Sequence, residues 1–237
     1  MQQLRSLDLM IYVRALGLLA RNPSIIIVPL LMGVIGVFVG QIGGNSAGSG
    51  ILGGLTGLLI LLLQMFAFGA ACIIADMAWR RGRASFDDGW NEARRKGGEI
   101  LVAAMGFTFV LYIASFAGSL IGPLAPILTA VAIYFLIYTI PAAAVGGVPG
   151  GAALQISIER ARNNPLPTIV VAVVSVAAFL YLNVLLAPLF ALLLAPLAFA
   201  SLNLLSALFG AIVQAIAVGY IALIVTKTYA DLSFGRR

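Results

Sequence analysis

The chain has no histidine, one cysteine and very few charged residues. Without histidine, and with Cys72 alone, it can form neither an internal disulfide nor a His/Cys zinc site, and we expect no cofactor. Cys72 lies in an apolar segment and is expected to pack as a small apolar side chain. Charged residues make up 9% of the 237 residues, against roughly 25% in an ordinary soluble domain. This scarcity argues against a soluble fold.

The hydrophobic residues, 62% of the chain, gather in uncharged blocks. Each block is about as long as the ~20 residues that a helix needs to cross the hydrocarbon layer. The blocks predict an all-α integral membrane protein, with residues 1–237 forming a single transmembrane domain. Pro29 and Pro141 are expected to interrupt and kink two of its helices. The six predicted transmembrane helices cover about 24–41, 51–79, 100–121, 124–148, 167–187 and 201–226.

The 14 basic residues occupy four regions: the N-terminal segment, residues 80–99, residues 150–166 and the C-terminal end. Six spans place all four regions on one side, which the positive-inside rule makes cytoplasmic. We therefore predict a multi-pass protein of the bacterial cytoplasmic (inner) membrane with both termini inside. Residues 167–226 are uncharged and long enough for three spans, but two keep the basic residues together. Whether residues 188–200 re-enter the membrane is left open.

Three basic segments precede the first, third and fifth spans and end in a similar way. They are Ala20–Pro23, Ala93–Lys96 and Ala161–Asn164, and each follows residues with helical periodicity. The ends of the second and sixth spans also match, as ADMAWRRGR (75–83) and ADLSFGRR (230–237). The pattern predicts three pseudo-repeated hairpins, each preceded by a cytoplasmic interfacial amphipathic helix. The repeat units would cover about 1–79, 80–149 and 150–237.

The third of these segments, ALQISIERARNNPLPTIVVAV (153–173), resembles a pattern of bacterial six-helix proteins. The matching residues are Ala153, Leu154, Ser157, Arg162 and Asn164, whereas Ile158 replaces a tryptophan and Asn163 a glycine. The chain resembles the glycerophosphoryl diester phosphodiesterase membrane-domain family and its stand-alone relatives. The resemblance implies a six-helix membrane fold. It implies no activity, because catalysis in the enzymes of that family belongs to a fused soluble barrel domain.

The stretch SFDDGWNEARRKGGE (85–99) contains the only cluster of acids, at Asp87, Asp88 and Glu92. These acids and Ser85 could furnish a catalytic site. Ser85 and Asp88 also have the spacing of a helix N-cap, and the acids lie before the bases, as the helix dipole favours. We therefore favour an interfacial helix over an active site, and we predict that the protein is not an enzyme.

Three other groups of charged and polar residues are candidates for a functional or structural role. Arg21, Arg94, Arg95, Lys96 and Arg162 are expected to contact lipid headgroups on the cytoplasmic side. Asp76, Arg80, Asp231 and Arg236 are expected to form a structural lock at the cytoplasmic helix ends, with a gate or ion site as the alternative. Gln64, Asn183 and Gln214 lie within spans, where they would bond between helices or line a translocation path.

The leading functional hypothesis is a non-catalytic, lipid-interacting scaffold or a subunit of an envelope complex. The alternative is a lipid or amphiphile translocator or a small-molecule transporter. The expected partners are membrane phospholipids, with a membrane-protein partner or a second copy of the chain left open. Binding to nucleic acid is not expected, because the basic residues are divided among four juxtamembrane segments.

The six-span arrangement is testable with topology reporters fused after residues 46, 123 and 237. We expect the first two fusions to report the outer side and the last the cytoplasmic side, because all four basic regions then share one face. Paired reporters active on opposite sides of the membrane provide the measurement and its control. An external residue 237 would contradict the prediction.

Overall fold

The computed structural model describes residues 8–43, 51–122, 124–186, 188 and 202–234. These residues are 89% helical with no strands, which confirms the predicted all-α class. The helices are α1 (Met10–Arg21), α2 (Ser24–Gly43), α3 (Ile51–Arg81), α4 (Phe86–Arg95), α5 (Gly97–Leu120), α6 (Ala125–Leu136), α7 (Thr139–Ala144), α8 (Gly150–Asn163), α9 (Pro165–Leu180) and α11 (Leu202–Phe234), with a π-helical turn at Tyr181–Leu186.

Five helical segments are long and apolar enough to cross a membrane. They are Thr56–Arg81, Gly97–Leu120, Ala125–Ala144, Pro165–Val184 and Ser206–Ser233. A sixth is formed if α1 and α2, which meet at an angle of 76°, are taken as one bent span. The predicted multi-pass helical architecture therefore agrees with the structure to the extent of five to six candidate spans. Except for Pro188, the segment 188–200 lies outside the described residues.

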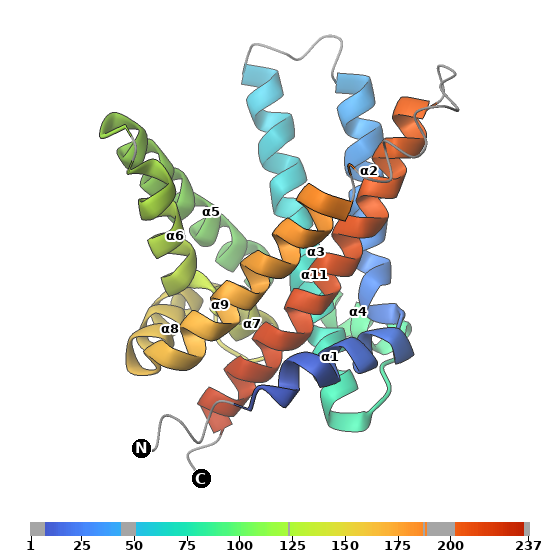
Figure 1. The fold of residues 1–237 in the computed structure, drawn as a ribbon, viewed down its shortest axis with the longest axis vertical. Coiled ribbons are helices and arrows are strands. Elements are labelled where there is room, and N and C mark those ends of the chain that lie inside the picture. Colours follow the sequence, from blue (N-terminus) through green and yellow to red (C-terminus); the bar gives the residue numbers. More distant parts are fainter. Residues whose placement is uncertain (1–7, 44–50, 123, 187, 189–201, 235–237) are drawn as a thin grey trace.

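The short helices α1, α4 and α8 lie toward one end of the molecule, where α11 also ends (Figure 1). The long helices extend from there toward the opposite end. α11 packs against α2 and α3, whereas α5 packs against α6 and α8. In Figure 1 the α5–α6 pair diverges from the group formed by α2, α3 and α11. The helix bundle thus has two parts that meet at the end where the short helices lie.

The core consists largely of small side chains. The fully or almost fully buried alanines include Ala67, Ala70, Ala71, Ala75 and Ala78 of α3, Ala103 and Ala104 of α5, and Ala142, Ala143 and Ala144 of α7. Cys72 is buried among them with a free thiol, as predicted. Large apolar side chains such as Phe109, Tyr112 and Phe116 point outward from α5. Small residues let helix backbones approach closely, which is typical of helix packing in membranes.

The fourth predicted span is interrupted between α6 and α7. Pro141 has no N–H to donate to the carbonyl of Ile137, one turn earlier, and the break falls at Ile137 and Tyr138. The predicted interruption at Pro141 is therefore confirmed. Pro29 instead lies inside α2 without ending it, so the interruption expected there is not seen.

Two helix ends share a conformation, and both lie in segments of the predicted repeat. Asn22 ends α1 with φ −130° and ψ 70°, and Asn164 ends α8 with φ −135° and ψ 66°. Each side-chain Nδ2 donates to a carbonyl four residues earlier, Leu18 O at 2.9 Å and Arg160 O at 3.1 Å. A proline follows both asparagines. The end of α4, at Lys96, has a different conformation, with φ −93° and ψ 6°.

Asn22 also joins its helix end to a distant segment. Its Oδ1 accepts the N–H of Ala84 at 2.9 Å, and its Nδ2 lies 3.4 Å from Gly82 O. Ser24 Oγ donates to Ala84 O at 3.1 Å. The turn between α1 and α2 is therefore attached to the connection between α3 and α4.

Replacing Asn22 with alanine should destabilise the protein more than replacing Asn164. The Asn22 side chain is only 3% exposed, and its loss leaves the Ala84 N–H without its partner. An unpaired buried group of this kind costs about 1–3 kcal/mol. Asn164→Ala is the matched control, since it removes only a bond to its own helix. Thermal unfolding in detergent measures both, and an equal or larger loss for Asn164→Ala would contradict the prediction.

Candidate functional site

Helix α4 begins with the predicted serine cap. Ser85 has extended backbone, and its Oγ accepts the N–H of Asp88 at 3.4 Å. Asp87 and Asp88 lie in the exposed first turn, while Phe86 and Trp90 pack their rings in a stack against the protein. The charged side of α4 thus faces away from the core. Ser85 forms a helix cap here, and no base is placed against its hydroxyl among the described side chains.

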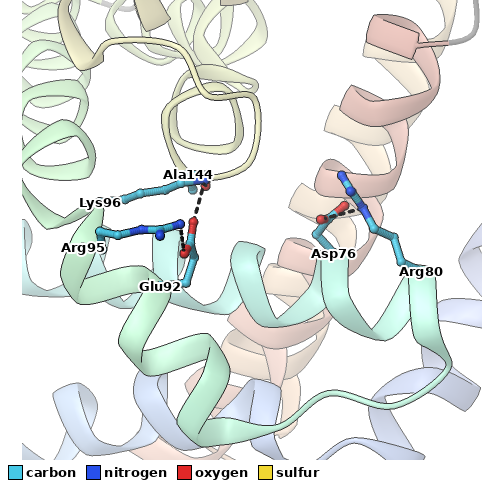
Figure 2. Close-up of polar contacts among 6 residues, drawn as sticks. All are labelled: Asp76, Arg80, Glu92, Arg95, Lys96 and Ala144. Carbon is cyan, nitrogen blue, oxygen red and sulfur yellow. Dashed lines mark hydrogen bonds and ion pairs between the residues drawn. The ribbon is translucent and has the colours of Figure 1, made fainter.

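Glu92 and Lys96 connect α4 to α7 (Figure 2). The carboxylate of Glu92 pairs with Arg95 and with Lys96, whose Nζ lies at 3.2 Å. Lys96 Nζ also donates to the carbonyl of Ala144 at 2.8 Å. Ala144 is the last residue of α7, where unpaired carbonyls favour a cation. The hydrogen bond from Arg95, with a smaller contribution from Lys96, outweighs partial burial and holds the pKa of Glu92 below its ordinary value.

Glu99 has a comparable role at the start of another helix. Its carboxylate accepts the N–H of Gly150, the first residue of α8. A side chain at position 150 would collide with the backbone of α5, since a Cβ there would lie 2.3 Å from Glu99 O. The acid that begins the third predicted span therefore caps α8.

The four predicted lock residues lie partly around one cavity. A cavity of about 590 Å³ is lined by Asp76, Trp79, Arg80, Thr226, Lys227, Ala230 and Asp231. Each carboxylate pairs within its own helix, Asp76 with Arg80 at 2.8 Å and Asp231 with Lys227 at 2.6 Å. Figure 2 shows the first pair. Arg236 lies outside the described residues.

Helices α3 and α11 are joined by residues that the sequence analysis did not single out as a pair. Trp79 Nε1 donates to Leu223 O at 3.0 Å, and the Lys227 ammonium lies 5.9 Å from the Trp79 ring centroid. Trp79 and Lys227 thus join α3 to α11. The sequence did show aromatic and basic residues at the ends of the second and sixth predicted spans. It did not show that these two helices are neighbours, which the contact requires.

The five predicted headgroup residues separate into two groups. Arg21, Arg94 and Arg162 are exposed, and their side chains have no ion pair or hydrogen bond among the described residues. Arg95 and Lys96 instead share the carboxylate of Glu92. Three of the five cations are therefore available to an anionic partner.

Helix α1 has an unusual exposed surface. Ile11, Ala15 and Leu19 are buried against the protein. On another side the helix exposes Met10, Val13 and Leu16, and Leu9 just before it is also exposed. Arg14 and Arg21, seven residues apart, share the edge between these surfaces. α1 is thus apolar on both its packed and its exposed sides.

The amides within the spans have different surroundings. Asn183 donates to Phe179 O at 3.0 Å in its own helix, so the interhelical bond expected for it is not formed. Gln64 and Gln214 instead line one cavity of about 360 Å³ between the helices. Among the described residues, neither glutamine side chain has a hydrogen-bond partner.

Comparison with protein-family models, curated proteins and solved structures gave no match in any of the three searches. The resemblance to the glycerophosphoryl diester phosphodiesterase membrane domain therefore stays a prediction. Within the part of the chain that the structure describes, no group of three or more His, Cys, Asp or Glu side chains could hold a metal ion.

The ion pairs of Glu92 with Arg95 and Lys96 should make the stability of the protein depend on pH. A carboxyl whose pKa is lowered by folding stabilises the fold above its unfolded pKa, near 4.5, and loses this contribution as the pH falls through the folded value. We expect Glu92→Gln to cost about 0.5–1 kcal/mol at neutral pH, as for two exposed ion pairs, and less in acid. The measurement is thermal unfolding in detergent at pH 3 and pH 7.

Asp88→Asn is the matched control, because the Asp88 carboxylate forms no ion pair among the described residues. The cap bond to Ser85 comes from the backbone N–H of Asp88 and is kept in this variant. A Glu92→Gln cost that is the same at both pH values would contradict the assignment of the pair.

Proposed function

We propose that the chain is a non-catalytic protein of the bacterial cytoplasmic membrane that binds phospholipids at the end carrying α1, α4 and α8. Its role would be that of a lipid-interacting scaffold or of a subunit of an envelope complex. The carrying observation is the surface of α1, which exposes Leu9, Met10, Val13 and Leu16 beside Arg14 and Arg21.

An exposed apolar side next to arginines suits the boundary between acyl chains and headgroups. There the apolar side chains leave water, and the long arginine side chains reach the phosphates. α1 meets the apolar α2 at 76°, so a spanning α2 would hold α1 far from the membrane normal. This orientation supports an interfacial helix on the cytoplasmic side.

The three unpaired arginines lie at equivalent positions in their helices. Arg21, Arg94 and Arg162 each lie in the last turn of their short helix, α1, α4 and α8. Each basic side chain near an anionic membrane surface gains about 1 kcal/mol. Three such cations at one end of the molecule favour anionic phospholipids over neutral ones.

The threefold repeat and the family resemblance are part of this proposal. The shared conformation at Asn22 and Asn164 supports equivalence of the first and third units. This equivalence aligns Asn22-Pro23 with Asn164-Pro165. It differs by one residue from the alignment of Ala20 with Ala161. The placement of α1, α4, α8 and the end of α11 at one end supports a single cytoplasmic side for both termini.

A second candidate function is a lipid or amphiphile carrier. The observation that favours it is the cavity of about 360 Å³ within the spans, which contains Gln64 and Gln214. A carrier needs a place within the membrane for the polar part of its cargo, and unpaired amides provide one.

Arg94 and Arg95 offer a test, because they are neighbours of equal charge with different partners. Arg94→Gln should lower the preference for phosphatidylglycerol over phosphatidylcholine about fivefold, since an unpaired cation is lost. Arg95→Gln should change it less, because Arg95 pairs with Glu92. Native mass spectrometry of the protein released from mixed-lipid nanodiscs gives the retained lipids.

Equal effects of the two variants would indicate a general charge effect and contradict a headgroup contact at Arg94. No effect of either variant would contradict the proposed anionic lipid surface at α4.

A further inference from the structure

The cavity within the spans is bounded by five parts of the fold: α3, α5, the α6–α7 segment, α9 and α11. α9 and α11 each line it with one side, because their lining residues recur every three to four positions. These residues are Ala172, Ser175, Val176 and Phe179 of α9, and Gln214, Val218, Ile221 and Val225 of α11. The cavity therefore follows the length of two neighbouring helices.

Three polar side chains interrupt its apolar wall. Gln64 and Gln214 bring carboxamides from α3 and α11, and Ser175 brings a hydroxyl from α9. Ser175 is 8% exposed, and its buried Oγ has no hydrogen-bond partner among the described residues. None of the residues lining the cavity is charged. An unpaired polar group in such surroundings costs free energy, so a ligand that pairs with these groups would be favoured.

The polar groups lie deep within the spans. Gln64 precedes Asp76 by 12 residues, and Gln214 precedes Lys227 by 13. At about 1.5 Å per residue, both amides lie about 18–20 Å from the charged end of their helices. Since the hydrocarbon layer is about 30 Å thick, they are near its middle and share one depth.

The size and opening of the cavity suit a chain-like molecule. From Gln214 to Val225 it extends along about 16 Å of α11. Its volume of about 360 Å³ is that of a small ligand pocket, which is typically about 300–1,000 Å³. Val176 and Phe179 line it and are also 47% and 43% exposed. The cavity is therefore accessible beside α9, one of the candidate spans.

We infer that this cavity binds an uncharged, hydroxyl-bearing amphiphile with one hydrocarbon chain, such as a monoacylglycerol. Its hydroxyl and ester groups would pair with Gln64, Gln214 and Ser175, and its chain would lie along the apolar residues of α9 and α11. A charged headgroup would lose its hydration at this depth without an opposite charge. A plain hydrocarbon would leave the three polar groups unpaired.

The inference names a ligand class for the carrier candidate, but binding does not require transport. It is independent of the headgroup surface at α1, α4 and α8. Arg94→Gln should leave the cavity ligand bound, and the cavity variants should leave the phosphatidylglycerol preference unchanged.

The test uses 1-oleoylglycerol, radiolabelled, and the purified full chain in detergent. Gln64→Leu combined with Gln214→Leu should weaken binding about tenfold or more, because two buried hydrogen bonds are lost while side-chain volume is nearly kept. Ala172→Trp should abolish binding by filling the cavity from α9. Oleate at pH 9 should bind at least tenfold more weakly than 1-oleoylglycerol, because its ionised carboxylate would be buried unpaired.

Asn183→Leu is the control, since it removes an amide from a candidate span that bonds within its own helix and does not line the cavity. It should bind 1-oleoylglycerol like the unmodified protein. Thermal unfolding identifies any variant that does not fold. In that case Ser175→Ala, which removes a single hydroxyl, is used instead, and we expect it to weaken 1-oleoylglycerol binding severalfold.

Three results would overturn the inference: unchanged binding in the glutamine pair and in Ala172→Trp, an equal loss in Asn183→Leu, or equal binding of oleate. Flipping of a headgroup-labelled phospholipid in liposomes is measured on the same variants. Binding of 1-oleoylglycerol without phospholipid flipping supports the binding site and argues against the carrier candidate. If Gln64→Leu combined with Gln214→Leu abolishes binding and flipping together, the binding site and the carrier function are both supported.

Discussion

Every backbone N–H and C=O within hydrocarbon needs a partner from the protein, and this constraint organises the structure. Within a helix the requirement is met automatically, so the difficult places are helix ends and breaks. Here several of these ends have a polar side chain assigned to them. Asn22 and Asn164 close α1 and α8, Lys96 reaches the last carbonyl of α7, and Glu99 accepts the first N–H of α8. Part of the chain's small number of polar residues therefore lies where the backbone requires partners.

This distribution changes the interpretation of the charged residues near the membrane. A cluster such as Asp87, Asp88 and Glu92 attracts attention because charge is rare in the chain. In the structure, Ser85 and the two aspartates begin α4, while Glu92 and Lys96 attach it to α7. The unassigned polarity lies elsewhere. It includes three exposed arginines at one end, and two glutamines and a serine around a cavity between the helices.

The spans followed from the sequence because apolar length alone determines them, and the serine cap followed because its partners are three residues apart. Contacts between distant residues did not follow. Lys96 meets Ala144 across 48 residues, Glu99 meets Gly150 across 51, and Trp79 meets Leu223 across 144. Gln64 and Gln214 could be recognised as polar residues within spans, but their shared cavity is formed by six helices that are distant in the sequence. Asn183 shows the limit of such reasoning, because its amide is equally polar and bonds only to its own helix.

The small size of the buried side chains has a consequence for how such a sequence can change over time. Ala70, Ala71 and Ala75 of α3 are completely buried, whereas the large residues of α5, such as Phe109 and Phe116, face outward. Hydrocarbon tails accept any bulky apolar group, so outward positions can exchange Leu, Ile, Val and Phe freely. The alanines cannot grow without separating two helices. In related chains, the smallest and least distinctive residues should therefore record common ancestry longest, while the conspicuous aromatic ones drift.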